Sequence, residues 1–271
     1  MRALTFNIRH GVGLDGVHDL ERVAAVIEAA APDVVALQEV DRHLSRTDHV
    51  DQAGWLAGRL GFDVTYGPVV DLGPVSPALG LRPGRSGLAR SLALRDARSG
   101  ESGDSGPDGA RRQYGIALLS RAPLEEARNL LLTRPKGGEQ RGLLGAAIAV
   151  EGRRVRVFCT HLQHRSRTER LAQATQIAES LAAAGGPVVV MGDLNARPGD
   201  REIAPLTAVL DDAWAVAGDG AGFTFDAATP HARIDYVLTS DDVVARHAAV
   251  IDTDASDHLP VLADLELASG G

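Results

Sequence analysis

Hydrophobic residues along this chain follow two spacings, which predict strands and helices that alternate in the sequence. Short runs rich in Val, Ile and Leu are typical of buried strands, whereas hydrophobic residues three and four positions apart are typical of helices with one buried face. Strands are expected over residues 2–8, 34–37, 63–66, 115–120, 127–132, 143–150, 154–160, 188–191, 223–225, 233–238, 243–251 and 261–267. Helices are expected over residues 19–30, 52–60, 166–183 and 202–209.

Two of the expected helices have clear start signals. Asp19 precedes a hydrophobic helical face and is a good N-terminal capping residue. Ser166 and Glu169 have the spacing of a capping box, in which each side chain bonds to the backbone of the other residue. Pro32 breaks the first helix, and the Gly-Gly-Pro sequence at 185–187 ends the second. A strand is expected to follow each break, as in a layered α/β protein.

The stretch 188–198 contains the strongest strand signal and ends in polar residues. Three valines and a methionine form a buried strand that reaches Gly192, and Asp193 and Asn195 follow in alternate positions. An extended backbone would direct both side chains to the same side. Pro198 prevents the strand from continuing. The same residue types are common in turns, so this stretch alone leaves a simple turn open.

The segment from about residue 71 to 112 differs from the rest in composition. It is rich in Gly, Pro, Ser, Arg and Asp, most strongly between residues 99 and 109. Few hydrophobic residues there could offset the entropy lost on ordering. We interpret it as a partly mobile insertion in a single domain that covers residues 1–271; a lid over the substrate is the alternative.

The composition of the chain disfavours several classes of protein. A length of 271 residues suits one large domain, and a net charge of −8 argues against a protein that wraps nucleic acid with a basic face, although a local basic groove stays open. Almost all basic residues are Arg, so one Arg is weak evidence for phosphate binding. The single cysteine, Cys159, excludes an intramolecular disulfide. Without a leader-like or membrane-spanning hydrophobic run, we expect a cytoplasmic protein with no obligate protein partner.

Polar residues that can bind metal or move protons accompany one expected strand after another. They are Asn7, Glu39, His161, Asp193, Asn195, Asp235, Asp257 and His258. Each alone has an ordinary explanation: a single carboxylate after a strand is usually solvated, and a single histidine is usually a hydrogen-bonded part of the scaffold. Their repetition is harder to explain as a series of turns. We therefore predict that these side chains meet at one reaction centre.

Eight short segments, most of which contain these residues, follow one another in a characteristic order: TFNIRHG, ALQEVDR, YGIALLSR, THLQH, GDLNARP, FTF, RIDYVL and SDHLPV. In this combination the chain resembles the endonuclease/exonuclease/phosphatase superfamily, which includes deoxyribonucleases, abasic-site endonucleases, neutral sphingomyelinases and inositol-phosphate phosphatases. The resemblance covers nearly all of the chain outside 71–112. It implies an α/β (α+β) fold in which two mixed β-sheets pack as a sandwich with helices on the outer faces.

The resemblance also implies a metal site. Glu39 matches the family's main Mg²⁺-binding carboxylate, and Asn7 and Asp257 match residues near the ion. Mg²⁺ prefers a few protein oxygens together with several waters, and Mn²⁺ is expected to substitute for it. A divalent cation is therefore the expected cofactor.

The remaining matches imply hydrolysis of a phosphoester by in-line attack of water on phosphorus. Asp193 and Asn195 match the pair that orients the water and the phosphoryl group. His258 matches a general base or phosphate ligand, and Asp235 matches the carboxylate that fixes its tautomer. His161 matches a histidine that contacts the phosphate or the leaving oxygen.

Three functions follow in order of preference. The first is a metal-dependent phosphodiesterase or phosphatase for a small or lipid-derived phosphoester, which the acidic charge and the few aromatic residues favour over nucleic acid. The second is a DNA endonuclease or exonuclease with an arginine-lined groove. The arginines available for such a groove are Arg82, Arg85, Arg90, Arg95, Arg98, Arg111 and Arg112. The third is a binding module that kept the fold without the chemistry.

Overall fold

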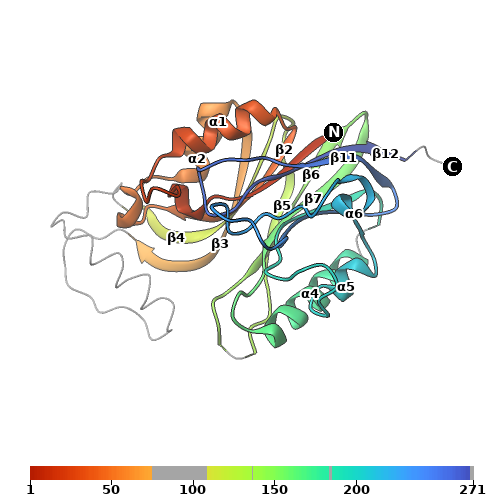
Figure 1. Ribbon diagram of the computed structural model, residues 1–271. Coiled ribbons are helices and arrows are strands. Elements are labelled where there is room, and N and C mark those ends of the chain that lie inside the picture. The colour runs from red at the N-terminus through yellow and green to blue at the C-terminus, as the bar shows by residue number, and fades with distance from the viewer. Residues whose placement is uncertain (75–108, 136, 183–184, 269–271) are drawn as a thin grey trace.

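A computed structural model describes residues 1–74, 109–135, 137–182 and 185–268 and shows two six-stranded sheets (Figure 1). The first sheet has the order β11-β12-β1-β2-β4-β3. Its strands are β1 (Arg2–Asn7), β2 (Val34–Arg42), β3 (Asp63–Pro74), β4 (Arg111–Ser120), β11 (Val243–Val250) and β12 (Val261–Leu267). The second has the order β5-β6-β7-β8-β10-β9. Its strands are β5 (Glu125–Leu131), β6 (Gly142–Val150), β7 (Arg153–His161), β8 (Val188–Asp193), β9 (Asp211–Asp212) and β10 (Asp235–Thr239).

Each sheet is mixed, because one pair of its neighbouring strands is parallel and the other described pairs are antiparallel. The parallel pairs are β1 with β2 in the first sheet and β7 with β8 in the second. β7 and β8 end side by side at His161 and Asp193, whereas β1 ends beside Gln38, inside β2. The predicted sandwich of two mixed sheets is confirmed.

Helices cover the outer face of each sheet, as Figure 1 shows. On the first sheet, α1 (Leu20–Ala30) and α2 (Gln52–Leu60) bury Ile27 and Leu56 in a hydrophobic cluster that includes Phe6 of β1. On the second, α4 (Arg167–Ala182) and α5 (Ala204–Thr207) bury Ile177 and Leu206 against β8. Both predicted helix starts are present. The Asp19 carboxylate accepts hydrogen bonds from the first turn of α1, and the Ser166 hydroxyl accepts one from the backbone N–H of Glu169. No helix among the described residues is long and apolar enough to cross a membrane.

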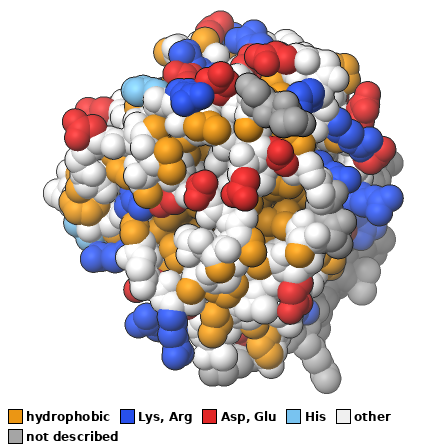
Figure 2. Space-filling model, turned by 90° about the vertical axis from the view of Figure 1, so that its right-hand side faces the viewer, with side chains coloured by type: hydrophobic (Ala, Val, Ile, Leu, Met, Phe, Trp, Pro, Cys, Tyr) orange, Lys and Arg blue, Asp and Glu red, His pale blue; other side chains and the backbone are white. Residues whose placement is uncertain are grey.

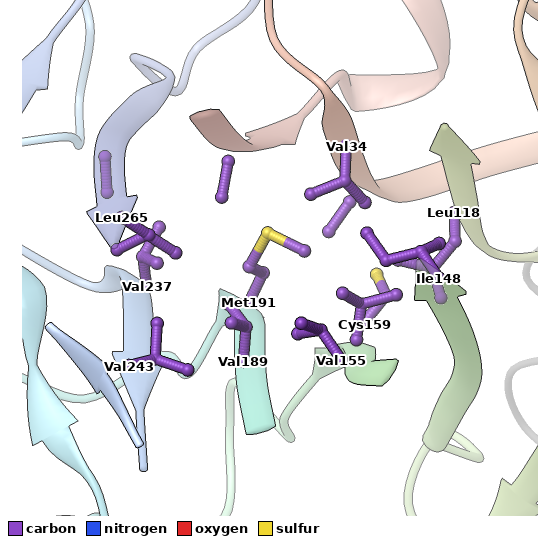
Figure 3. Packing of buried hydrophobic residues seen from close by; sticks show 14 of the residues in the cluster. Val34, Leu118, Ile148, Val155, Cys159, Val189, Met191, Val237, Val243 and Leu265 are labelled. Carbon is purple, nitrogen blue, oxygen red and sulfur yellow. The ribbon is translucent and has the colours of Figure 1, made fainter. Parts of the chain in front are cut away.

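The largest hydrophobic core fills the space between the two sheets (Figure 3). Val34 and Leu118 of the first sheet face Met191 and Cys159 of the second, and all four are buried. The core rests on aliphatic residues, as the scarcity of aromatics predicts. Gln38 is a polar exception, and its amide nitrogen donates to Thr5 Oγ1 at 3.2 Å and to Cys159 Sγ at 3.4 Å, so its burial is compensated.

Several predicted boundaries were wrong. β2 continues to Arg42 rather than ending near residue 37, because a β-bulge lets the strand pass the polar residues 38 and 39. Residues 223–225 form no strand and contribute only isolated bridges at Phe225. The helix expected over 202–209 is limited to α5, and the short elements β9 and α6 (Ala213–Ala217) were not predicted.

The segment 71–112 begins and ends in strands. β3 extends to Pro74 and β4 starts at Arg111, so both ends of the expected insertion belong to the first sheet. Arg111 Nε forms an ion pair of 2.7 Å with Asp71, and Arg112 donates to the Leu72 carbonyl oxygen at 3.3 Å. Residues 75–108, on which the prediction of a mobile insertion rests, lie outside the described residues.

Candidate active site

The predicted site residues meet around the carboxyl ends of β1, β7 and β8. Asn7 is the last residue of β1, and His161 and Asp193 are the last residues of β7 and β8. Asn7 Nδ2 donates to Asp193 Oδ2 at 3.2 Å, which joins the first sheet to the second. The site is thus built from both layers of the sandwich.

Glu39 lies inside β2, not at a strand end as the sequence suggested. It occupies the β-bulge with φ +57°, a left-handed conformation that is uncommon for a residue other than glycine. The bulge turns its carboxylate toward β1, where Glu39 Oε1 accepts a hydrogen bond of 3.4 Å from Asn7 Nδ2. Arg9 and His10, which follow β1, also have positive φ values. Strained backbone of this kind often accompanies a functional site.

Asp257 completes the group of oxygen ligands predicted for a metal. It precedes β12, which runs antiparallel to β1, so the start of β12 lies beside the end of β1. The adjacent Ser256 hydroxyl donates to the Asn7 carbonyl oxygen at 2.7 Å, and Arg9 Nε lies 3.4 Å from Asp257 Oδ2. Asn7, Glu39 and Asp257 are therefore gathered around one strand end.

The chemistry of this group fits a hard divalent cation. The Glu39 side chain keeps 28% of its exposure, so an ion can reach it. Burial nevertheless raises the pKa of Glu39, although the positive charges of His258 and Arg141 and the hydrogen bond from Asn7 partly oppose this rise. A divalent cation would favour the ionised form of this partly buried carboxylate, and carboxylate oxygens are ligands that Mg²⁺ and Mn²⁺ prefer.

Asp193 lies at the centre of the second half of the site. Its Oδ2 atom is 3.2 Å from Asn7 Nδ2, 3.3 Å from His161 Nε2 and 3.9 Å from His258 Nε2. The pKa of Asp193 is raised to about 7, mainly by burial and secondly by repulsion from Asp235. A carboxylate poised near neutral pH is suited to accept a proton.

Asn195 follows Asp193 in a turn, so the two side chains do not alternate along a strand as predicted. Asn195 has φ +50°, and its backbone N–H donates to Asp193 Oδ1 at 2.8 Å. Its side-chain Nδ2 donates to the Leu162 carbonyl oxygen at 3.1 Å. These bonds fix the turn beside Asp193, and the role of Asn195 toward a phosphoryl group stays a prediction.

Asp235 and His258 form the predicted pair. Asp235 starts β10 rather than ending a strand, but β10 runs antiparallel to β8, so Asp235 lies opposite Asp193. Asp235 Oδ2 is 3.0 Å from His258 Nδ1. Burial opposes a charged imidazole, but the charge and hydrogen bond of Asp235, helped by Asp193, outweigh it and raise the pKa of His258 to about 10. Arg233, two residues before Asp235, pairs with Asp212 at 2.7 Å.

The FTF segment, residues 223–225, contacts both Asp235 and His258. Thr224 Oγ1 accepts hydrogen bonds from the backbone N–H groups of Ile234 and Asp235. The Phe225 ring lies 4.8 Å from the His258 ring, centroid to centroid, at 46°. The segment thus holds both members of the pair.

Asp193, Asp235 and His258 also offer possible metal ligands within 4.8 Å of one another. Here, however, Nδ1 of His258 is already bonded to Asp235, and Asp193 is bonded to Asn7 and faces His161. We therefore favour the Glu39 group for the cation and a hydrogen-bonding role for this cluster.

His161 has an environment opposite to that of His258. Its Nε2 atom faces the Asp193 carboxylate at 3.3 Å, while its Nδ1 atom lies 3.0 Å from Arg141 Nη1. The pKa of His161 is lowered well below its ordinary value, mainly by burial and secondly by the positive charge of Arg141. The opposed pKa shifts suit the two histidines to different roles in the site.

Sequence reasoning missed three residues that hold the site together: Arg141, Thr224 and Ser256. Arg141 gave no signal, because arginine is common in this chain. Thr224 and Ser256 do lie in the FTF and SDHLPV segments, so their position in a motif was the available signal.

The end of β8 requires a glycine at position 192. Replacement of Gly192 should therefore disrupt this end of the strand. Its φ is +154°, and a Cβ atom there would overlap the carbonyl oxygen of Thr160 on β7. We expect Gly192→Ala to lower the free energy of unfolding by about 1–3 kcal/mol or more, as overpacking does, and to impair activity by displacing Asp193. Urea denaturation measures the first effect. Gly58→Ala is the matched control: Gly58 lies in α2 with open space around it, so alanine should be neutral or stabilising there.

Comparison with known proteins places this site in context. The sequence matches the family described as "Endonuclease/Exonuclease/phosphatase family" over residues 4–258. Among solved structures, the chain is similar to an endonuclease/exonuclease/phosphatase from Beutenbergia cavernae, with 26% identity and a TM-score of 0.72; the match covers 98% of this chain and 71% of the other.

Two further structures share the fold at lower identity. A mannosyl-6-phosphatase from Bacteroides thetaiotaomicron is 17% identical, with a TM-score of 0.71 over 98% of this chain and 100% of that one. The human Nocturnin catalytic domain with bound sulfate is 22% identical, with a TM-score of 0.68 over 98% and 94%. Both support the fold of this chain.

Proposed function

This chain belongs to the endonuclease/exonuclease/phosphatase family, and from that membership we propose that it is a metal-dependent hydrolase of phosphate esters. The observation that carries the proposal is the position of Asp193 Oδ2, which lies within 3.9 Å of side-chain nitrogens of Asn7, His161 and His258. Such a ring of donors around a carboxylate suits a water nucleophile and a phosphoryl group.

Each group of site residues has a separate role in the proposed hydrolysis. Asp193, with its pKa raised to about 7, accepts the proton of the attacking water. His258, protonated through its contact with Asp235, stabilises the charge that develops on the phosphoryl oxygens. Glu39, with Asn7 and Asp257 beside it, would hold a divalent cation, which would supply further charge stabilisation when bound. The leaving oxygen departs opposite the water, as in-line displacement requires, and takes up a proton from solvent.

We propose a small or lipid-derived phosphoester as the substrate. The net charge of −8 disfavours a polyanionic partner. Figure 2 shows one face of the molecule, on which acidic, basic and hydrophobic side chains are interspersed. Of the arginines considered for a DNA groove, Arg111 is neutralised by Asp71 and Arg112 bonds to backbone, while the others lie outside the described residues.

A substrate panel tests the proposal. We would assay a generic phosphodiester, a generic phosphomonoester, sugar phosphates, nucleotides, inositol phosphates, phospholipids and supercoiled plasmid, each with Mg²⁺, Mn²⁺ or EDTA. Asp193→Asn, which keeps the size of the side chain, is the inactive control. EDTA-sensitive hydrolysis of a small or lipid ester supports the proposal. Salt-sensitive nicking of plasmid without small-ester turnover would make the protein a nuclease instead.

A further inference from the structure

Arg141 is a buried arginine that contacts one of the candidate catalytic histidines. It precedes β6, which pairs with β7, and its side chain is only 2% exposed. Arg141 Nη1 lies 3.0 Å from His161 Nδ1, and Arg141 Nη2 lies 3.2 Å from His164 Nδ1. Glu139 Oε1, 3.2 Å from Nη1, balances its charge.

The contact with Arg141 determines which nitrogen of His161 carries hydrogen. A guanidinium can only donate hydrogen bonds. His161 Nδ1 must therefore be the acceptor, and a hydrogen on that atom would point at the N–H groups of Arg141. The hydrogen of the neutral ring then lies on Nε2, the atom that faces Asp193 Oδ2 at 3.3 Å.

His258 shows the opposite arrangement within the same site. Its Nδ1 atom faces the Asp235 carboxylate, which can only accept hydrogen bonds when ionised, so Nδ1 carries the hydrogen and Nε2 faces the centre. One imidazole is thus backed by a carboxylate and the other by a guanidinium.

We propose that Arg141 is a positioning residue that holds His161 as the neutral Nε2–H tautomer, so that His161 donates a fixed hydrogen bond in the site and transfers no proton. The receiving group during turnover is a phosphoryl oxygen, an assignment that rests on the proposed function. The tautomer itself depends only on the geometry around Nδ1.

The first test is direct and needs no substrate. Nitrogen-15 NMR of protein labelled at histidine distinguishes protonated from unprotonated ring nitrogens, and His161→Gln identifies the His161 signals by their loss. We expect an unprotonated Nδ1 and a protonated Nε2 at neutral pH. A protonated Nδ1, alone or in an imidazolium, would overturn the proposal whether or not the protein hydrolyses phosphoesters.

The second test assigns the tautomer to Arg141. In Arg141→Met the donors are lost, and we expect His161 to lose its single tautomer and kcat to fall about 10- to 100-fold, the range seen for residues that orient another group. Because Glu139 would then be left buried without its partner, Arg141→Met/Glu139→Gln is the second variant, in case the first does not fold. Arg154→Met, which removes an arginine that is 47% exposed on β7, should leave the His161 signals unchanged. Wild-type tautomer signals in the folded Arg141 variants would contradict the assignment.

Discussion

His258→Ala should lower turnover by about 10²- to 10³-fold, the range of effects typical of removing one group that stabilises the developing charge. The imidazole is buried against Phe225, and its Nε2 atom is the nitrogen that faces Asp193. Asp235→Asn should be nearly as severe although it preserves size. An amide can hold the wrong tautomer, and it cannot stabilise the imidazolium that Asp235 favours. Steady-state kcat and KM of both variants measure the effect.

The double variant tests whether the two residues act as one unit. Removal of either should already abolish their joint contribution, so Asp235→Asn/His258→Ala should be little worse than the more damaging single change. Losses that simply multiply would refute the pair. His247→Ala is the matched control, because that histidine is 58% exposed on β11 and its ion pair with Asp264 spans 3.7 Å.

Glu39→Gln should weaken binding of Mg²⁺ or Mn²⁺ by more than about 100-fold, since residues that only support metal ligands already contribute 10- to 100-fold. The change removes the anionic ligand while keeping its shape and its position in the β2 bulge. Calorimetric titration of the protein with Mn²⁺ measures affinity without any substrate. Activity should fall in parallel, with partial recovery at high metal concentration.

The control for this prediction separates a metal ligand from a surface charge. Glu179→Gln removes the same charge from an exposed position of α4 and should leave the Mn²⁺ affinity unchanged. Melting temperatures of both variants without metal should stay near wild type. Unaltered Mn²⁺ affinity in Glu39→Gln would show that Glu39 is not the main ligand.

The hydrophobic pattern predicts most of the fold because burial of strands and helices depends on local spacing. α1, α2 and β8 lie where the pattern placed them. The pattern could not predict that β2 continues through Glu39, because the bulge is set by pairing with β4, in which Gly115 lies opposite Val40 although it is distant in the sequence. β9 and α6 were missed because elements of two and five residues are too short to show a period.

Most residues of the candidate site could be predicted from the sequence, but their arrangement in space could not. Motifs identified its polar residues, but only tertiary structure shows that Asp235 begins a strand and still meets His258. Arg141 could not be predicted, because its importance comes from the atom of His161 that it contacts. Residues that can bind a metal or a phosphate can be recognised from their type and motif. A residue that fixes the tautomer of another side chain cannot be recognised in this way.

The bond between Asn7 and Asp193 has a mechanical consequence. Each residue is rigidly attached to its own sheet, so the 3.2 Å between their atoms is set by how the two sheets seat on each other. The hydrophobic core between the sheets, which includes Val34, Leu118 and Met191, therefore helps to set the geometry of the active site. A substitution deep in that interface, out of reach of any substrate, would act on catalysis by letting one half of the reaction centre slide past the other.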